Sequence, residues 1–119
     1  MFKYIDHVAI HCSDLARSAR FYETVMGFEP WVGHDNRIQY FKCGDTLLEL
    51  TMKVPAQEMS GMHFCVQAED IDTAVATLKE RGAECVLEPR PSTGRVPGEE
   101  NLRRAVFKGP DGELIEVRG

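Results

Sequence analysis

The sequence predicts an α+β domain built from two similar βαβββ modules, and three observations support this prediction. A segment starting at His7 aligns with one starting at His63, so that Gly27 meets Gly82 after a single gap. Each segment reads as a strand, an amphipathic helix and three shorter strand-like runs. The 119 residues suffice for one compact domain with its own core. We place the first module at residues 1–56 and the second at residues 57–119.

The first module is expected to hold one strand, one helix and then three further strands. Their predicted ranges are 4–12, 13–27, 28–33, 37–43 and 46–53. Ser13 or Asp14 can cap the helix by accepting hydrogen bonds from its free N–H groups, and Gly27 suits a left-handed exit. The residues expected on the buried helical face are Leu15, Ala19, Tyr22 and Met26.

The second module repeats this plan with a longer connection. Its predicted elements are a strand over 62–67, a helix over 70–81 and strands over 83–88, 103–108 and 113–118. The helix has its own apolar face, formed by Ile71, Val75 and Leu78. The stretch "EPRPSTGRVPGEEN", residues 88–101, is rich in Pro, Gly and charge and is predicted to be a loop.

Composition excludes several classes of function. The net charge of −5 argues against broad binding to a nucleic acid backbone, which needs a concentrated basic surface. We expect no membrane contact and a cytoplasmic location, because no apolar run has the length of a membrane span and the start does not resemble a signal peptide. The four cysteines lack metal-site spacing, so we expect reduced thiols that behave as small buried hydrophobic residues.

Four strands each carry an apolar face and, on the opposite face, one candidate metal ligand. Alternation along the strands assigns these positions to His7, Glu49, His63 and Glu116. A single histidine or glutamate of this kind is more often an ordinary core or surface residue. The same pair in both halves favours a metal site, because two curved sheets would bring the four side chains together. Two nitrogens and two oxygens suit one divalent ion, without selecting among Ni, Zn, Co, Mn and Fe.

The stretches "DHVAIHCSDLARSARFYETVMGFEP", "HFCVQAEDIDTAVATLKERGAE" and "FKGPDGELIEV" resemble the vicinal oxygen chelate superfamily, which includes glyoxalase I and bleomycin-resistance proteins. The resemblance covers essentially the whole chain. It implies a cupped, eight-stranded mixed sheet around a metal or ligand. It also implies a homodimer, whose sites are either shared between modules of two chains or closed by the two modules of one chain. The ligand positions it implies are again His7, Glu49, His63 and Glu116, in the His-Glu-His-Glu order of glyoxalase I.

This resemblance implies a metal-dependent lyase acting on a small molecule. Such an enzyme isomerises the hemithioacetal of a 2-oxoaldehyde, such as methylglyoxal, into a 2-hydroxyacyl thioester through a metal-bound enediolate. Glu116 is the expected base and Glu49 its counterpart. His11 and Arg37 are weaker candidates for substrate contact.

Two other classes of function stay open at this point. One is another metal-dependent reaction, either epimerisation or the transfer of a thiol or water to an epoxide of the fosfomycin type. Similar epimerases typically carry a glutamine where this chain has Glu49. The other class is a binding protein that sequesters a small molecule without chemistry, although members of that kind lack a complete set of metal ligands.

Overall fold

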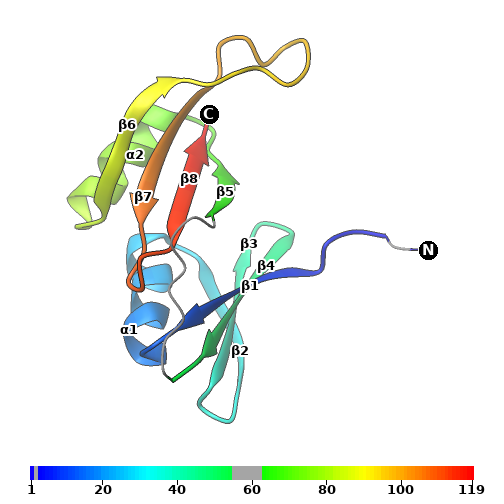
Figure 1. The fold of residues 1–119 in the computed structure, drawn as a ribbon, viewed down its shortest axis with the longest axis vertical. Helices are drawn as coiled ribbons and strands as arrows, with labels where there is room; N and C mark the ends of the chain where they lie inside the picture. Colours follow the sequence, from blue (N-terminus) through cyan, green and yellow to red (C-terminus); the bar gives the residue numbers. More distant parts are fainter. Residues whose placement is uncertain (2, 55–62) are drawn as a thin grey trace. The chain divides into compact units, whose positions relative to one another are not determined.

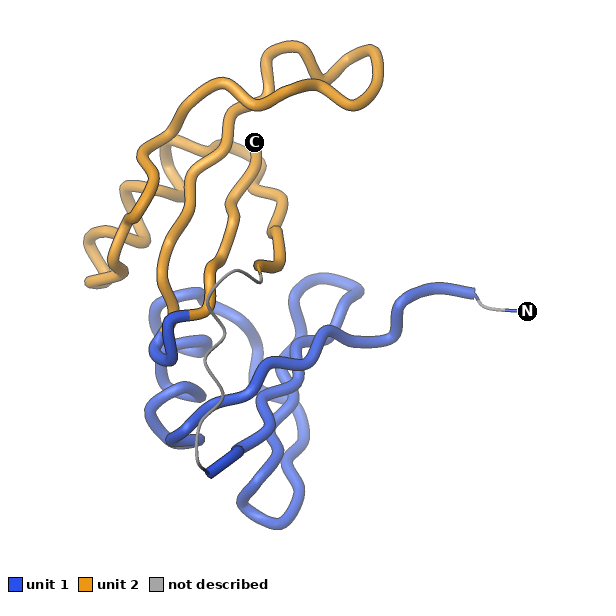
Figure 2. The backbone as a smooth tube through the Cα atoms, in the orientation of Figure 1, with its two compact units in different colours: residues 1–59, 110–112 blue, residues 60–109, 113–119 orange. Residues whose placement is uncertain are grey.

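The computed structural model describes residue 1, residues 3–54 and residues 63–119. It divides into two compact units (Figure 2). The first comprises Met1–Met59 and Pro110–Gly112, and the second comprises Ser60–Gly109 and Glu113–Gly119. The predicted module boundary between residues 56 and 57 lies outside the described residues, as does Met62, the predicted start of one strand.

The first unit is one βαβββ module with a four-stranded mixed sheet (Figure 1). Its elements are β1 (His7–Cys12), α1 (Leu15–Arg20), a π-helical turn (Phe21–Val25), β2 (Glu29–His34), β3 (Ile38–Cys43) and β4 (Thr46–Met52). The strand order is β1-β4-β3-β2, with β1 and β4 parallel and the other pairs antiparallel.

The second unit repeats the same topology. Its elements are β5 (His63–Gln67), α2 (Ile71–Glu80), β6 (Glu84–Pro91), β7 (Arg103–Lys108) and β8 (Leu114–Arg118). The strand order is β5-β8-β7-β6, again with one parallel pair, β5 and β8. The α+β class and the two βαβββ modules are therefore confirmed, while the joining of both sheets into one cup stays a prediction.

Aspartates begin both helices, as the sequence predicts. The Asp14 carboxylate accepts a hydrogen bond from the Arg17 N–H at 3.0 Å, and the Asp70 carboxylate accepts one from the Thr73 N–H at 2.7 Å. Gly27 follows the first helical segment with φ of 76°, a left-handed conformation that favours glycine.

The first helix differs from the prediction in its buried face. Ser18 and Tyr22 are fully buried, whereas Leu15, Ala19 and Met26 are only half-buried. Burial of Ser18 is tolerated because its hydroxyl donates a hydrogen bond to Asp111 Oδ2 at 3.3 Å. The continuous α-helix predicted over 13–27 was also wrong, since the segment widens into a π-helical turn at Phe21.

Alternation along the strands predicted the buried faces of β1, β4 and β8, although Val8 in β1 is exposed and the apolar face of β5 is only half-buried. The buried apolar residues of the first unit are Ile10, Cys12, Tyr22, Phe28, Phe41, Leu48 and Leu50. Those of the second unit are Ile71, Val75, Leu78, Ala105, Phe107, Ile115 and Val117. Each helix packs on one face of its own sheet, so the opposite face carries the polar positions.

Two further predictions need correction. β6 extends to Pro91, so residues 88–91 are strand rather than the start of a loop, because Arg90 and Pro91 still pair with β7. The cysteines are free, but only Cys12 is buried and Cys65 is exposed, since Cys65 lies on the polar face of β5. Among the described residues, no helix combines the length and the apolar character needed to cross a membrane.

Candidate functional site

The first unit brings His7 and Glu49 together across the parallel pair β1 and β4. Glu49 is the register partner of Ala9, two residues beyond His7, and the side chains of alternate residues share a face. His7 Nε2 lies 3.3 Å from Glu49 Oε2. The Glu49 side chain is 14% exposed and that of His7 is 37% exposed, so the pair is accessible from the polar face of the sheet.

Asp6 determines which ring nitrogen of His7 carries a proton. Asp6 Oδ2 lies 3.0 Å from His7 Nδ1, and an ionised carboxylate only accepts hydrogen bonds, so Nδ1 carries the proton. Nε2 is then the atom that faces Glu49, and its lone pair is available to bind a cation. A carboxylate behind a histidine is the usual support of a metal-binding imidazole.

Two hydroxyl groups orient the Glu49 carboxylate. Tyr40 Oη donates to Oε2 at 2.5 Å, and Thr51 Oγ1 donates to Oε1 at 2.5 Å. These bonds, with that from Thr51 first, lower the pKa of Glu49, and the bond to Glu49 raises the pKa of Tyr40. Tyr40 was not among the predicted site residues, although it lies on the polar face of β3, opposite to the face of the buried Phe41.

The second unit contains the equivalent pair, His63 and Glu116, with the same offset. Glu116 is the register partner of Cys65, two residues beyond His63, and His63 Nε2 lies 3.8 Å from Glu116 Oε2. The Glu116 side chain is 13% exposed, whereas that of His63 is 56% exposed. The internal repeat is therefore also a repeat of strand register.

Glu116 has different neighbours from Glu49. Arg104 Nη1, from β7, lies 3.3 Å from Glu116 Oε2, and Cys65 Sγ lies 3.7 Å from Oε1. Burial, followed by the nearby Glu116 carboxylate, raises the pKa of the Cys65 thiol to about 11. Arg104 was not among the predicted site residues, and the register of β7 against β8 is what brings it there.

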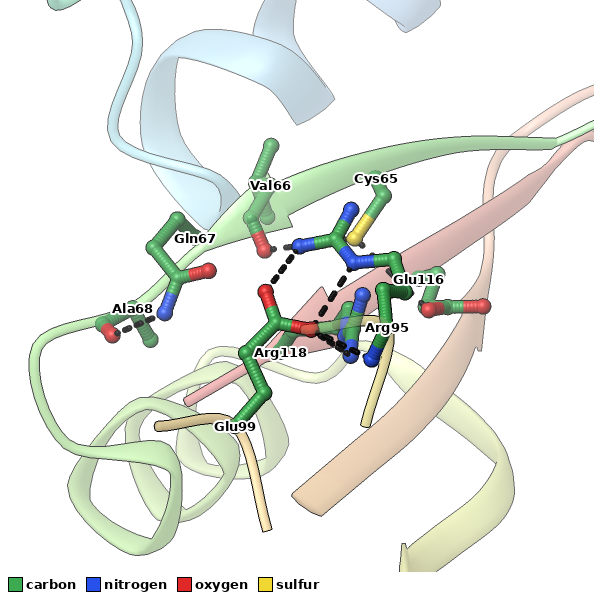
Figure 3. A network of polar contacts seen from close by, with 8 residues as sticks. All are labelled: Cys65, Val66, Gln67, Ala68, Arg95, Glu99, Glu116 and Arg118. Atoms are coloured by element: carbon green, nitrogen blue, oxygen red, sulfur yellow. Dashed lines mark hydrogen bonds and ion pairs between the residues drawn. The ribbon is translucent and has the colours of Figure 1, made fainter. Parts of the chain in front are cut away.

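A pocket of about 360 Å³ adjoins this second pair. Its lining residues are His63, Cys65, Gln67, Arg95, Glu116 and Arg118. Arg95 lies on the segment after β6, and its guanidinium donates to Glu99 Oε1 and Oε2 at 2.5 and 3.0 Å (Figure 3). These bonds hold the pKa of Glu99 down at about 2.

The donor atoms of each pair suit a divalent ion. Nitrogen and oxygen ligands about 2.1 Å from a metal lie roughly 3.0 to 3.4 Å apart in octahedral or tetrahedral geometry. The separation at His7 and Glu49 falls in that range, and the one at His63 and Glu116 exceeds it by a few tenths of an ångström. Within the described parts of the chain, no group of three or more His, Cys, Asp or Glu side chains is arranged so that it could hold a metal ion. The structure therefore describes two His–Glu pairs, each within its own unit.

The weaker candidates lie outside these pairs. His11 is the register partner of Thr51, and its charge contributes a small part of the lowered pKa of Glu49. Arg37 is exposed just before β3, where its N–H donates to the His34 carbonyl oxygen at 3.0 Å.

Comparison with known proteins identifies one superfamily that covers nearly the whole chain. Residues 4–117 match the model of the Glyoxalase/Bleomycin resistance protein/Dioxygenase superfamily. Virulence protein STM3117 of Salmonella typhimurium is 28% identical over 95% of this chain and 81% of its own length. The mitochondrial methylmalonyl-CoA epimerase of Bos taurus is 28% identical over 65% of this chain and 53% of its own length.

Solved structures show the same fold. That of the Salmonella typhimurium virulence protein has a TM-score of 0.79 at 24% identity, covering 99% of this chain and 97% of that one. Lactoylglutathione lyase from Agrobacterium tumefaciens has a TM-score of 0.76 at 20% identity, covering 99% and 94%. The fosfomycin resistance protein FosX from Mesorhizobium loti has a TM-score of 0.75 at 19% identity, covering 99% and 92%.

Proposed function

Because the chain belongs to the Glyoxalase/Bleomycin resistance protein/Dioxygenase superfamily, we propose that it is a metal-dependent lyase of the glyoxalase I type. The proposed reaction isomerises the hemithioacetal of a 2-oxoaldehyde and a thiol into a 2-hydroxyacyl thioester. The observation that carries the proposal is the His–Glu pair that recurs at the same strand register in both units, at 3.3 and 3.8 Å.

The proposed ligands of a divalent ion are His7, Glu49, His63 and Glu116. The ion would be nickel, zinc, cobalt, manganese or iron, all of which accept this mixed donor set. When bound, it would supply Lewis acidity toward two adjacent oxygens of the substrate. The support that Asp6 gives to His7 Nδ1 is of the kind expected behind a metal ligand.

Glu116 is the proposed base. The reaction moves a proton from the carbon that bears the thiol sulfur to the neighbouring carbonyl carbon. The hydroxyl proton on the first carbon moves to the oxygen on the second, so atoms balance without an oxidant or reductant. A carboxylate that takes up and returns the carbon-bound proton must be able to shift between positions. The contacts of Glu116 are long, 3.3 to 3.8 Å, whereas two hydroxyls at 2.5 Å fix Glu49. Glu49 is therefore proposed as the more static of the two carboxylates.

Elemental analysis of protein purified without chelators or added metal tests the proposed site. We expect about one divalent ion per site, and strongly reduced metal in a Glu116→Gln variant. Glu88→Gln is the matched control, because Glu88 lies on β6 of the same unit and pairs with Lys79 at 2.7 Å. Stoichiometric metal retained by Glu116→Gln would contradict the role of Glu116 as a ligand.

An activity assay tests the reaction. The protein is supplied with methylglyoxal and a panel of thiols, and thioester formation is followed. We expect product with wild-type protein and with Glu88→Gln, and a loss of at least 100-fold in Glu116→Gln, the usual range for a general base. Absence of thioester with every thiol and every metal loading would refute the lyase.

Epimerisation is the second candidate, because the chain resembles methylmalonyl-CoA epimerase over 93 residues. It needs the same removal and return of a proton beside a carbonyl group, for which Glu116 is again the proposed base. Solvent deuterium incorporation into methylmalonyl-CoA separates the two reactions. Incorporation without any thioester from methylglyoxal would favour the epimerase.

A further inference from the structure

One side chain in the pocket of the second unit is buried with unused hydrogen-bond donors. The Arg118 side chain is only 9% exposed, although it lies on the polar face of β8, two residues beyond Glu116. Its Nε and Nη2 atoms are buried and donate no hydrogen bond to the described part of the chain. Burying a charged donor without a partner is costly, so these atoms indicate a missing acceptor.

The two unused donors have a specific geometry. Nε–H and one N–H of Nη2 project in parallel from the same edge of the planar guanidinium. That edge is the fork that binds both oxygens of a carboxylate side by side. An acceptor with two coplanar oxygens therefore fits both donors at once.

Glu99 does not fill this fork. Its Oε2 atom lies 3.8 Å from Arg118 Nη2, which is beyond hydrogen-bond distance. The same carboxylate accepts hydrogen bonds from the backbone N–H and the guanidinium of Arg95 at 2.5 to 3.0 Å (Figure 3). Glu99 thus accepts hydrogen bonds from Arg95 and is not a bidentate partner of Arg118.

The charges around the pocket favour an anion. Three guanidinium groups, those of Arg95, Arg104 and Arg118, face two carboxylates, Glu99 and Glu116. One positive charge is left over even with a neutral His63. A ligand with a single negative charge would balance it.

We propose that this pocket binds a carboxylate group of the substrate through the Nε and Nη2 edge of Arg118. That the ligand is a substrate rests on the proposed function. The inference adds that the substrate, or the thiol that reacts with it, carries a carboxylate. Because Arg118 is two residues from Glu116 on one strand face, the carboxylate is held about 7 Å along the strand from the reacting centre.

A direct test uses the full chain after dialysis against EDTA, so that it does not depend on metal binding. The Nε–H signal of Arg118 is followed by NMR during titration with propionate, with propionamide as the neutral counterpart and methylphosphonate as a tetrahedral anion. We expect a saturable shift with propionate, at least tenfold weaker binding of propionamide, and no tighter binding of methylphosphonate. An unmoved Arg118 signal up to 100 mM propionate, or an equal response to propionamide, would overturn the proposal.

Variants show whether Arg118 itself binds. Arg118→Met should lower propionate affinity at least tenfold, and Arg118→Lys should lower it several-fold, because lysine keeps the charge without the fork. Arg103→Lys is the control, since Arg103 pairs with Asp72 outside the pocket. If the Arg118 variants do not fold, the wild-type titration decides alone. Propionate binding to protein that never takes up metal would refute the proposed lyase and support the carboxylate site. Metal uptake without propionate binding would refute the carboxylate site and leave the proposed lyase standing.

Discussion

Removal of the Tyr40 hydroxyl tests the geometry around Glu49 most directly. Tyr40→Phe deletes the hydrogen bond to Glu49 Oε2 and leaves the bond from Thr51 to Oε1. A hydrogen bond to a charged group contributes about 1.5 to 3 kcal/mol. Because the carboxylate is partly accessible to water, which replaces some of that energy, we expect a loss of about 1 to 2 kcal/mol in the free energy of unfolding.

The assay is urea unfolding followed by circular dichroism, with thermal melts beside it. For a chain of this size the expected loss corresponds to a fall in Tm of roughly 4 to 8 °C. Tyr4→Phe is the matched control, since Tyr4 is 77% exposed. Equal stabilities of the two variants would refute the assignment of the Tyr40 hydroxyl to Glu49.

The hydrogen bond between Tyr40 and Glu49 also predicts how the difference in free energy of unfolding between wild type and Tyr40→Phe depends on pH. The pKa of Glu49 lies below its ordinary value of 4.5, so the stabilisation is present above pH 4.5 and is lost as pH falls through the lowered pKa. The pKa of Tyr40 lies above its ordinary value of 10.0, so the stabilisation is present below pH 10 and is lost as pH rises through the raised pKa. The stability difference should be largest between about pH 5 and 9 and should narrow at both ends. A difference that stays constant from pH 2 to pH 11 would contradict this coupling.

Two further predictions concern the second unit. With a pKa of about 11, Cys65 should react slowly with iodoacetamide at pH 8. The Glu116→Gln substitution should accelerate this reaction several-fold, because it removes a negative charge that raises the pKa of Cys65. Cys43 is the internal control in the same mass-spectrometric experiment, since burial alone raises its pKa, and equal acceleration of both thiols would contradict the contact. The Arg95–Glu99 pair should persist on acidification, because the pKa of Glu99 is about 2 and its stabilising effect is lost only as pH falls through that value. A carboxyl carbon NMR titration of Glu99 with a midpoint near 4.5 would show that the pair does not form.

Much of the fold was predictable because local rules act within short segments. Alternation along each strand identified the buried faces, and the duplicated pattern of helix and glycine identified the two modules. The first helix was less predictable, because Ser18 is buried through a hydrogen bond to Asp111, which lies far along the sequence. The sequence does not show that a hydroxyl at residue 18 has such a partner.

The sequence predicted which His and Glu side chains share a face, but not what surrounds them, and their role as metal ligands stays a prediction. Alternation decides which face a side chain occupies, whereas the register between strands decides which side chain lies beside it. Tyr40 is the register partner of Glu49, and Arg104 is that of Arg118, and neither pairing follows from one strand alone. No prediction was made for Arg118, whose burial is unusual because arginine is mostly exposed in proteins.

The shared strand register of the two units has a consequence for how the halves can be exchanged. Both units have the imidazole, the acid and the same spacing between them, and they differ in the neighbours of the acid. Glu49 is surrounded by hydroxyl groups and Glu116 by guanidinium groups. A chimera made of two first halves would thus carry the same histidine and glutamate pair twice, and both of its glutamates would be held by hydroxyl groups and neither by a guanidinium group.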